Sequence, residues 1–516
     1  MRARVRALLL LIPALAGGVS LAAQAVERSD EPGRGTIRVT FDPRIMTWNS
    51  EFTDRGRLDV GRGLTGDTAG GTYIPTVARL QQDVRLASGV AGFVASLGQG
   101  QLTVRQERRT YPVTAELGLT DRLSVSLMVP IVRVGTRSAF RLGPTGSNLG
   151  RNPLVTDATT AGASYQTFFS QFDAALTQLD QNIAGGMYGC GANPSCAARD
   201  SSAYWHAVRD ALNRSVYGLG VTGQPFLPRD SSDGGKGIRA NVAAIQQDMA
   251  SQFAVLAFTE TLLLPSDTID DRVMEEVIVD SAIGFGYRAF PFRHSFRYNV
   301  GDVELAAKYR FAAGAHYAAA AVALVRLPTG ATDSADDVLA QSIGDHQTDL
   351  EGRLVQELTV GPVWLNLAVR AGVQLPGTRV RRVAPWYALL VPFAATTALR
   401  WDPGDYVAVD VAPLVRLAPQ FAAGFTAGYW TKARDRYTFQ SPEDSTDLAV
   451  RLGVPTSASV LDPGTSQRWL RLGFALSYVG PTVEGGFSIE QTVTGAGVVP
   501  AATVYRIVLR LSRKLF

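Results

Sequence analysis

The sequence has little of the material from which most catalytic and metal-binding centres are built. Among 516 residues there are only two cysteines and four histidines. The histidines form no His-x-His or His-x3-His pair, whereas metal sites and histidine-based catalysis draw on such clusters. We therefore expect no metal, no cofactor and no enzymatic activity. The four residues are His206, His294, His316 and His346.

Motifs of nucleotide-binding and hydrolytic enzymes are also missing. The chain has no Gly-x-Ser-x-Gly elbow, no Walker loop and no Gly-x-Gly-x-x-Gly segment ahead of a helix. The segment Asp230-Ser-Ser-Asp-Gly-Gly has the outline of a calcium loop but lacks its alternating ligands and its final Glu. We predict a flexible loop there.

Long apolar runs are absent beyond the first 25 residues. A membrane-spanning helix needs about 18 or more consecutive apolar residues. The strongest candidate, Ala384 to Leu399, contains two prolines and two threonines. We expect no transmembrane helix.

The net charge gives no sign of a nucleic-acid partner. Arg2, Arg4 and Arg6 stand in a segment that we expect to be removed, and without them the 50 basic residues become 47, against 46 acidic ones. Because nucleic-acid binding depends on a basic surplus, we exclude this class of partner.

Residues 1–25 have the order of a secretory signal peptide. Three arginines precede an apolar run, and small residues end in Ala23-Gln24-Ala25. A membrane anchor is the weaker alternative because Pro13 and two glycines interrupt the run. The absence of a cysteine after Ala25 argues against a lipid anchor. We predict an exported protein that begins at Val26.

Apolar residues alternate with polar ones through the second half of the chain. One run, from Val303 to Phe311, places five apolar residues on one face and all of its charges on the other, which a helix cannot do. Similar runs recur to the C-terminus and span about 10 to 14 residues, longer than the five or six of soluble strands. Strands of this length suit a bilayer crossing.

The predicted fold class is therefore all-β: an antiparallel transmembrane β-barrel of 12 or 14 strands with a helical insert. Tight turns such as Thr120-Asp121-Arg122 alternate with long polar loops, as in outer-membrane barrels. About thirteen candidate strands can be counted, with the first at Thr36 to Trp48. The odd count traces to a conflict between two short turns, Asp402 to Asp405 and Ala418 to Gln420.

A soluble β-sandwich is the main alternative fold, with its apolar face turned inward. Strand length, the signal peptide and the near absence of charge on the apolar face favour the membrane barrel. The polar face then lines the lumen, and its mixed signs predict weak ion selectivity. The residues predicted to face the lumen are Glu116, Glu304, Lys308, Arg310, Arg326, Glu351, Arg353, Glu357, Arg370, Asp410, Arg416, Arg471, Glu484 and Glu490, together with Arg506 and Arg510.

Two segments resemble an outer-membrane family named for meta-pathway phenol degradation and transport. They are the hairpin Glu116 to Pro130 and the strand Val300 to Phe311, followed by Leu327-Pro-Thr-Gly. The C-terminal Phe516 is similar to the aromatic residue that the barrel-assembly machinery reads, although its parity differs from that of the preceding strand. The resemblance implies a passive channel for small, apolar or aromatic molecules, distantly like FadL-type channels. The Asn-Pro-Ala signature of FadL is not found.

Between the first clear hairpin and residue 300 the apolar spacing becomes helical. Helices are predicted around Tyr165 to Leu179, Ser202 to Val216 and Val242 to Leu262, with helix caps from Asp200 onward. These helices could cap the pore, enter it as a plug, or pack together outside. A glycine-rich stretch and a candidate helix at Thr76 to Leu86 form a second candidate plug.

The two cysteines, Cys190 and Cys196, stand in a turn between predicted helices. An even number of cysteines in an exported chain predicts a disulfide, and five intervening residues can close the loop. A metal site is the alternative and would need further ligands.

The predicted organisation is a signal peptide (1–25), an N-terminal segment with the first strand and a candidate plug (26–100), a barrel hairpin (101–138), a mostly helical insert (139–299) and the main barrel strands (300–516). The predicted function is passive passage of small molecules through the outer membrane of a Gram-negative-type bacterium. Its expected partners are outer-membrane lipid, the assembly machinery through Phe516 and an unidentified solute. Two alternatives remain: a binding or structural barrel that acts through its insert, and an outer-membrane hydrolase.

Overall fold

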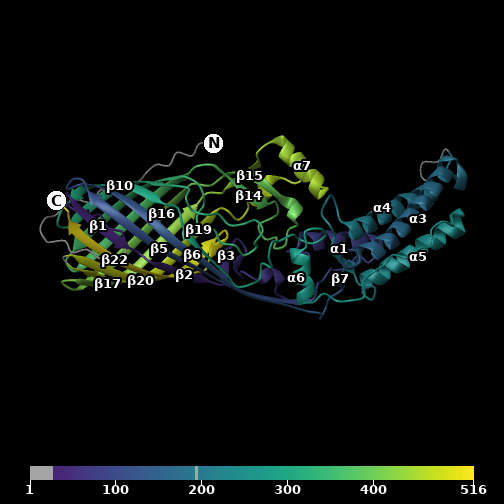
Figure 1. The fold of residues 1–516 in the computed structure, drawn as a ribbon, viewed down its shortest axis with the longest axis horizontal. Coiled ribbons are helices and arrows are strands. Elements are labelled where there is room, and N and C mark those ends of the chain that lie inside the picture. The colour runs from purple at the N-terminus through teal and green to yellow at the C-terminus, as the bar shows by residue number, and fades with distance from the viewer. Residues whose placement is uncertain (1–26, 192–195, 481, 516) are drawn as a thin grey trace.

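A closed antiparallel β-barrel of 12 strands forms the body of the molecule, and a helical domain extends from one end (Figure 1). The computed structural model describes residues 27–191, 196–480 and 482–515. The predicted signal peptide and Phe516 lie outside the described residues. The predicted fold class is confirmed.

Two of the 12 barrel positions are each built from two short strands. The first is β1 (Thr36–Phe41) followed by β2 (Arg44–Trp48), and the fourth is β9 (Ser295–Val300) followed by β10 (Glu304–Ala313). Strand β22 pairs with both β1 and β2 and so closes the barrel. The remaining positions are β5 (Gln99–Gly118), β6 (Leu123–Gly143), β11 (Tyr317–Arg326), β12 (Asp349–Val360), β13 (Val363–Gln374), β16 (Tyr406–Ala418), β17 (Phe421–Lys432), β19 (Gln467–Val479), β20 (Val483–Ala496) and β22 (Thr503–Lys514).

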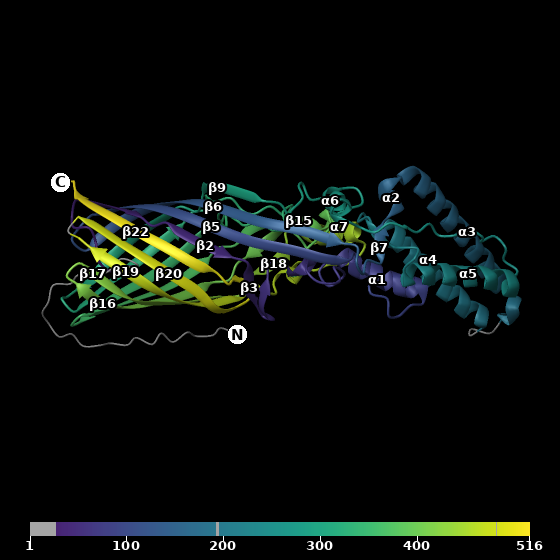
Figure 2. The same cartoon turned by 90° about the horizontal axis from the view of Figure 1, so that it is seen from below.

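The two ends of the barrel differ in the length of their connections. Tight turns join β5 to β6, β10 to β11, β12 to β13, β16 to β17 and β19 to β20 at the end where β22 terminates (Figures 1 and 2). All but one of the connections at the other end are long, and that end carries the helices. Outer-membrane barrels have short periplasmic turns and longer extracellular loops. We therefore assign the helical end to the outside.

The odd strand count is resolved at the conflict between the two short turns. The alternating segment before Asp402 is β15 (Thr396–Asp402), which is not a barrel strand. It pairs with β14 (Gly377–Arg382) and β18 (Arg436–Phe439) in a separate sheet beside the barrel mouth. The turn at Ala418 to Gln420 does join two barrel strands. A local pattern could not distinguish these two environments.

The outward face of the barrel carries a band of exposed apolar side chains. Leu305 is 46% exposed, Ile507 54% and Phe425 71%, and such values would be costly for a soluble sheet. Apolar side chains on this face are solvated by lipid instead. No helix in the described part of the chain is both long and apolar enough to cross a membrane.

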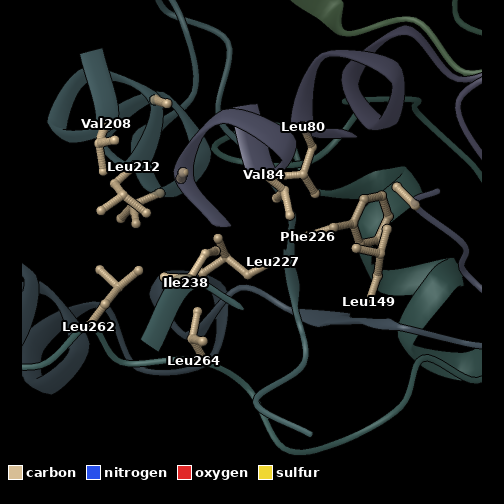
Figure 3. Close-up of a cluster of buried hydrophobic side chains, with 14 of the residues drawn as sticks. Leu80, Val84, Leu149, Val208, Leu212, Phe226, Leu227, Ile238, Leu262 and Leu264 are labelled. Atoms are coloured by element: carbon tan, nitrogen blue, oxygen red, sulfur yellow. The ribbon is translucent and has the colours of Figure 1, made fainter. Parts of the chain in front are cut away.

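The helical domain is assembled from segments that are far apart in sequence. It comprises α1 (Pro75–Ser88), β7 (Leu149–Arg151), α2 (Pro153–Thr156), α3 (Ala158–Ala184), α4 (Ala197–Tyr217), β8 (Phe226–Pro228), α5 (Asp233–Phe253) and α6 (Asp271–Val279). Figure 3 shows Leu80 and Val84 of α1 in one apolar cluster with Leu212 of α4 and Ile238 of α5. Residues from before β5 and after β6 therefore share one core.

This arrangement corrects the expectation that Thr76 to Leu86 is a plug. The helix exists as α1, but its apolar face packs against α4 and α5 outside the barrel. Leu80 and Val84 are fully buried there. Burial of these side chains against other helices is favourable, whereas a charged lumen offers them no apolar partner.

Three local predictions in the insert are also corrected. Helix α4 begins at Ala197 rather than Ser202, with Cys196 at its N-cap. Helix α5 ends at Phe253, so Leu262 belongs to the extended segment that follows. The segment expected to be a flexible loop instead starts α5, because the Ser232 side chain accepts a hydrogen bond from the Gly235 amide.

Smaller elements surround the barrel mouth. Strands β3 (Ser50–Thr53) and β4 (Gly56–Asp59) form a hairpin that pairs with β21 (Val499–Pro500). Helix α7 (Pro442–Leu452) lies in the connection between β18 and β19 and has a complete capping box at Ser441 and Asp444.

The predicted disulfide between Cys190 and Cys196 is confirmed, with 5.3 Å between the two Cα atoms. It joins the end of α3 to the start of α4. Replacing both cysteines by Ser should remove about 2 kcal/mol of loop-closure stabilisation from this hairpin. We expect faster proteolysis between residues 185 and 200 and an unchanged heat-modifiable gel shift of the barrel. Loss of the gel shift would contradict this separation of insert and barrel.

Opposite faces of one strand should differ sharply in their tolerance of charge. Leu305 faces lipid, and the adjacent Ala306 faces the lumen. Leu305→Arg should destabilise the barrel by about 2 to 4 kcal/mol, whereas Ala306→Arg introduces the same side chain on the polar side and should fold with normal yield. Urea titration of the two variants in lipid vesicles measures the difference. Equal stabilities would show that the faces are wrongly assigned.

Candidate solute pathway in the barrel lumen

The charged residues singled out from the sequence share one face of the barrel wall. All 16 lie on the strand face opposite to the exposed apolar side chains, as their register with neighbouring strands requires. None of them is more than partly exposed. Their effect on solute passage stays a prediction.

One wall of the lumen carries a ladder of alternating charges. Arg326 lies between two carboxylates: its Nη2 is 2.8 Å from Glu304 Oε1, and its Nη1 is 2.6 Å from Asp349 Oδ2. Arg353 pairs with Glu351 on its own strand, and its Nη2 is 3.7 Å from Glu304 Oε2. The charges compensate one another within the wall, so this wall presents no large field of one sign.

A second paired group lies on the opposite side, where the first barrel position is interrupted. Asp42 accepts from Arg506 Nε at 2.7 Å and from Arg44 Nη2 at 2.6 Å. Pro43 follows Asp42 and lacks a backbone donor, which accounts for the break between β1 and β2.

The periplasmic half of the lumen is crossed by the N-terminal segment, residues 27–31. Arg28 Nη1 lies 3.0 Å from Glu484 Oε1 on β20, while Arg353 Nη1 on β12 lies 3.2 Å from Glu27 Oε1. The order of strands places β20 and β12 five positions apart around the barrel, so the segment reaches nearly from wall to wall.

Asp30 is the centre of this interaction. Its carboxylate is 2.8 Å from Arg28 Nε and 2.7 Å from Arg38 Nη2, and its backbone carbonyl accepts from Lys308 Nζ. Arg38 and Lys308 also lie 3.4 Å from Glu116. The segment thus supplies an anion to cations that the barrel wall turns inward.

The sequence expectations do not include this occupant of the lumen, because the plugs predicted from sequence lie in apolar or glycine-rich segments. The available signal was charge: four of the five residues from Glu27 to Glu31 are ionisable. This cluster of charged residues, shortly after the predicted cleavage site, can form ion pairs with the mixed charges of the predicted lumen wall.

At the extracellular mouth, the connection between β11 and β12 lies against the inward face of β5 and β6. Arg108 donates to the carbonyls of Ser342 at 2.7 Å and Ile343 at 2.9 Å. The Ile343 side chain packs on Val132 and Val134. This connection therefore narrows the mouth on one side.

Arg382 connects segments of the mouth to the helical domain. Arg382 donates to the carbonyls of Phe285, Gly286 and Val391 and pairs with Asp336. Its guanidinium lies 3.7 Å from the ring centre of Tyr287, and burial raises the pKa of that tyrosine above its usual value. Several extracellular segments are thereby fixed relative to the barrel.

The opposite side of the mouth carries an aromatic strip, defined as Tyr406, Trp430 and Trp469 on β16, β17 and β19. The two indole rings are stacked with centroids 6.1 Å apart, and Tyr406 lies 6.3 Å from Trp430. Arg471 lies 4.1 Å from the Trp469 ring centre. The strip offers flat faces and one cation to a passing molecule.

Gly372 makes room for this strip. A Cβ atom built at Gly372 would lie 2.3 Å from the Tyr406 ring, so the ring lies across a position that has no side chain. The Tyr406 hydroxyl then reaches Glu351 and donates a hydrogen bond to it. The aromatic strip is thus connected to the charged ladder of the neighbouring wall.

With this geometry, the chain is similar to several solved outer-membrane barrels. The COG4313 outer membrane channel from Pseudomonas putida F1 is 7% identical, with a TM-score of 0.42 and coverage of 95% of this chain and 100% of that chain. The Pseudomonas putida toluene transporter TodX is 10% identical, with a TM-score of 0.26 and coverage of 95% and 91%. A Pseudomonas aeruginosa FadL homologue is 7% identical, with a TM-score of 0.25 and coverage of 93% and 90%.

No family model matches the chain, and no curated protein matches it significantly. Structural likeness at this level identifies neither the solute nor the family.

The seat of the N-terminal segment can be tested through Ser29, whose side chain is fully buried. Both native cysteines are bonded to each other, so Ser29→Cys introduces a unique thiol that should react slowly with a maleimide. Adding Asp30→Asn removes the anion that two arginines share, and breaking a buried pair is strongly destabilising. We expect the labelling rate to rise about tenfold or more, because roughly 1.4 kcal/mol suffices for that factor.

The matched control is Asp447→Asn in the Ser29→Cys background. Asp447 pairs with Arg451 on the exposed helix α7, far from the N-terminal segment in sequence and in the fold. The thiol of this double variant should react with the maleimide at the same rate as that of Ser29→Cys alone. Fast labelling before any charge is removed would contradict the seating of residues 27–31 in the lumen.

Proposed function

We propose that the protein is a passive outer-membrane channel for small aromatic molecules, with residues 27–31 closing its periplasmic half. The observation that carries this proposal is the lumen's composition: an aromatic strip and a charged ladder lie at the mouth, and a charged segment crosses the barrel below them. Ion pairs hold the segment in place, so it can be displaced without breaking the barrel's backbone hydrogen bonds.

The aromatic strip supports the choice of solute class. Rings bind each other in stacked or edge-on arrangements that are worth about 0.5 to 1.5 kcal/mol beyond their buried area. This is enough to favour an aromatic solute over an aliphatic one and too little to trap it. A channel needs such weak, repeated binding.

The remaining parts of the proposal follow from the sequence and the barrel. The protein is exported, resides in the outer membrane of a Gram-negative bacterium, and is assembled there through its C-terminal Phe516. It acts without cofactor and without catalysis. The meta-pathway and FadL-like resemblance is kept as the proposed family relationship.

Electrical recording tests both halves of the proposal. Deleting residues 27–33 should turn a mostly silent protein into one with steady conductance in planar bilayers. In that open variant, benzenesulfonate should block the current more strongly than methanesulfonate. Trp430→Ala with Trp469→Ala should weaken the benzenesulfonate block about fivefold, since about 1 kcal/mol of stacking is lost.

Trp386→Ala is the matched control, because Trp386 lies in the connection between β14 and β15, where Arg62 covers its ring, and not on a barrel strand. It should leave the block unchanged. Equal conductance with and without residues 27–33 would refute the closing role of the segment. Equal block by the two sulfonates would refute the aromatic solute class.

A second candidate function is surface binding by the helical domain, which is favoured by how far α3, α4 and α5 extend beyond the barrel (Figure 2). Removing the domain must also remove α1, since its buried face would otherwise be exposed. Loss of whole-cell adhesion with unchanged conductance would support this candidate.

A further inference from the structure

The outer surface of the barrel carries a polar cavity of about 630 Å³ at the extracellular rim. It is formed by the outward faces of β2, β5, β6 and β22, with the β3–β4 hairpin on one side and the start of β9 on the other. Its lining includes Arg57, Arg105, Arg137, His294 and Thr503. The cavity lies outside the lumen and has no part in the proposed channel.

The outward direction of these side chains follows from strand register. Arg105 pairs across the hairpin with Arg137, and both have the same parity as the lipid-facing Val113 and Ile131 on their strands. His294 directly precedes Ser295, which pairs with Thr136, so it stands beside Arg137. Three basic side chains and a histidine therefore converge on one cavity.

The arginines of this cavity form no ion pair within the part of the chain that the structure describes. Among the described residues, none of Arg57, Arg105 and Arg137 lies within ion-pair distance of a carboxylate. The nearby Glu107 is held by Arg109, with contacts of 2.7 and 2.9 Å, and attracts Arg137 only from beyond ion-pair distance. Many inward arginines of the barrel are paired with carboxylates, as Arg326 and Arg506 are, whereas here three arginines gather in one cavity without such a pair.

The cavity's position relative to the membrane indicates which part of a lipid can reach it. On β22, Thr503 precedes the lipid-facing Tyr505 by two residues and therefore lies closer to the extracellular end. On β9, Phe296 and Tyr298 are 65% and 73% exposed, as is typical of aromatic side chains at the interface. The cavity thus begins where the apolar band ends, at the level of lipid headgroups.

We propose that this cavity binds the phosphorylated sugar headgroup of a glycolipid in the outer leaflet. Arginine forks match phosphate oxygens, and basic pockets at a bilayer surface recognise anionic headgroups. Thr47, Thr103 and Thr503 place hydroxyl oxygens in the cavity that can accept hydrogen bonds from sugar hydroxyls. The acyl chains would continue along the exposed apolar band below. This inference does not depend on the proposed channel function.

Native mass spectrometry of the full-length protein in detergent tests the proposal, with diphosphoryl lipid A as the added probe. Wild-type protein should retain the lipid, and Arg105→Gln with Arg137→Gln should bind it about 30-fold more weakly, at about 1 kcal/mol for each basic residue. Arg57→Gln alone should weaken binding about fivefold. This second variant lies outside the barrel wall, so it stays informative if the double variant assembles poorly.

The matched control is Arg122→Gln with Arg513→Gln, two exposed arginines at the periplasmic end. It changes the net charge equally and should retain lipid like the wild type. Lipid A without its phosphates should bind all proteins alike and weakly.

Two results would overturn the proposal. One is equal retention of diphosphoryl lipid A by the wild type, the Arg105 and Arg137 double variant and the control. The other is displacement of the lipid by inorganic phosphate at equal concentration, which would make the cavity a site for a free anion. Weaker retention in both arginine variants, with no effect of inorganic phosphate, supports the headgroup.

Discussion

The need to pair every backbone amide and carbonyl inside lipid determines the rest of this structure. A hydrocarbon layer offers no substitute hydrogen bonds, so a sheet within it has to close. Here β22 pairs with β1 and β2, which removes the last edge. This need for a closed sheet applies only within the hydrocarbon layer. Beyond the rim, β5, β6 and β9 continue as an open sheet that carries the extracellular connections and the helical domain.

Closing the sheet encloses a lumen, and the side chains that face this lumen have to be packed or solvated. Inward side chains of a 12-stranded barrel enclose too much space to be filled by apolar residues alone, and charges placed there are partly removed from water. Neighbouring side chains of the wall compensate these charges by forming ion pairs, as Arg326 and Asp42 do. Where wall cations remain, the N-terminal segment adds Asp30. The same electrostatic rule therefore explains both the wall and its occupant.

The alternation of apolar and polar residues was sufficient to predict which face of each strand meets lipid. Parity is a local property, so Leu305 and Glu304 could be assigned from nearest neighbours alone. Local sequence patterns did not predict where α1 and β15 lie in the fold. Each has the correct internal pattern, but its location depends on partners far away in sequence, such as Leu212 for α1 and Tyr437 for β15.

In the candidate site, too, some features follow from local sequence and others depend on contacts between distant residues. The charged wall was predictable because it follows from strand parity. The aromatic strip required the register between three strands, which brings Trp430 opposite Trp469. The position of Glu27 to Glu31 could be predicted only with knowledge of the closed barrel, because the partners of this segment lie on several strands, among them β1, β10, β12 and β20. Sequence spacing carries no information on such contacts.

The position of the N-terminal segment also links its seating to closure of the barrel. The segment directly precedes β1, which pairs with both the second and the last barrel strand. Glu484, the partner of Arg28, stands on β20, next to the last strand. The segment therefore cannot make its full set of ion pairs until the C-terminal strands have joined the sheet. Once seated, residues 27–31 are held by ion pairs and by hydrogen bonds to side chains of the wall, such as Glu357 and Lys308. Strand β1 is held instead by backbone–backbone hydrogen bonds. The segment can leave the lumen while the barrel stays closed, and this difference in bonding is what makes a displaceable closure compatible with an intact membrane barrel.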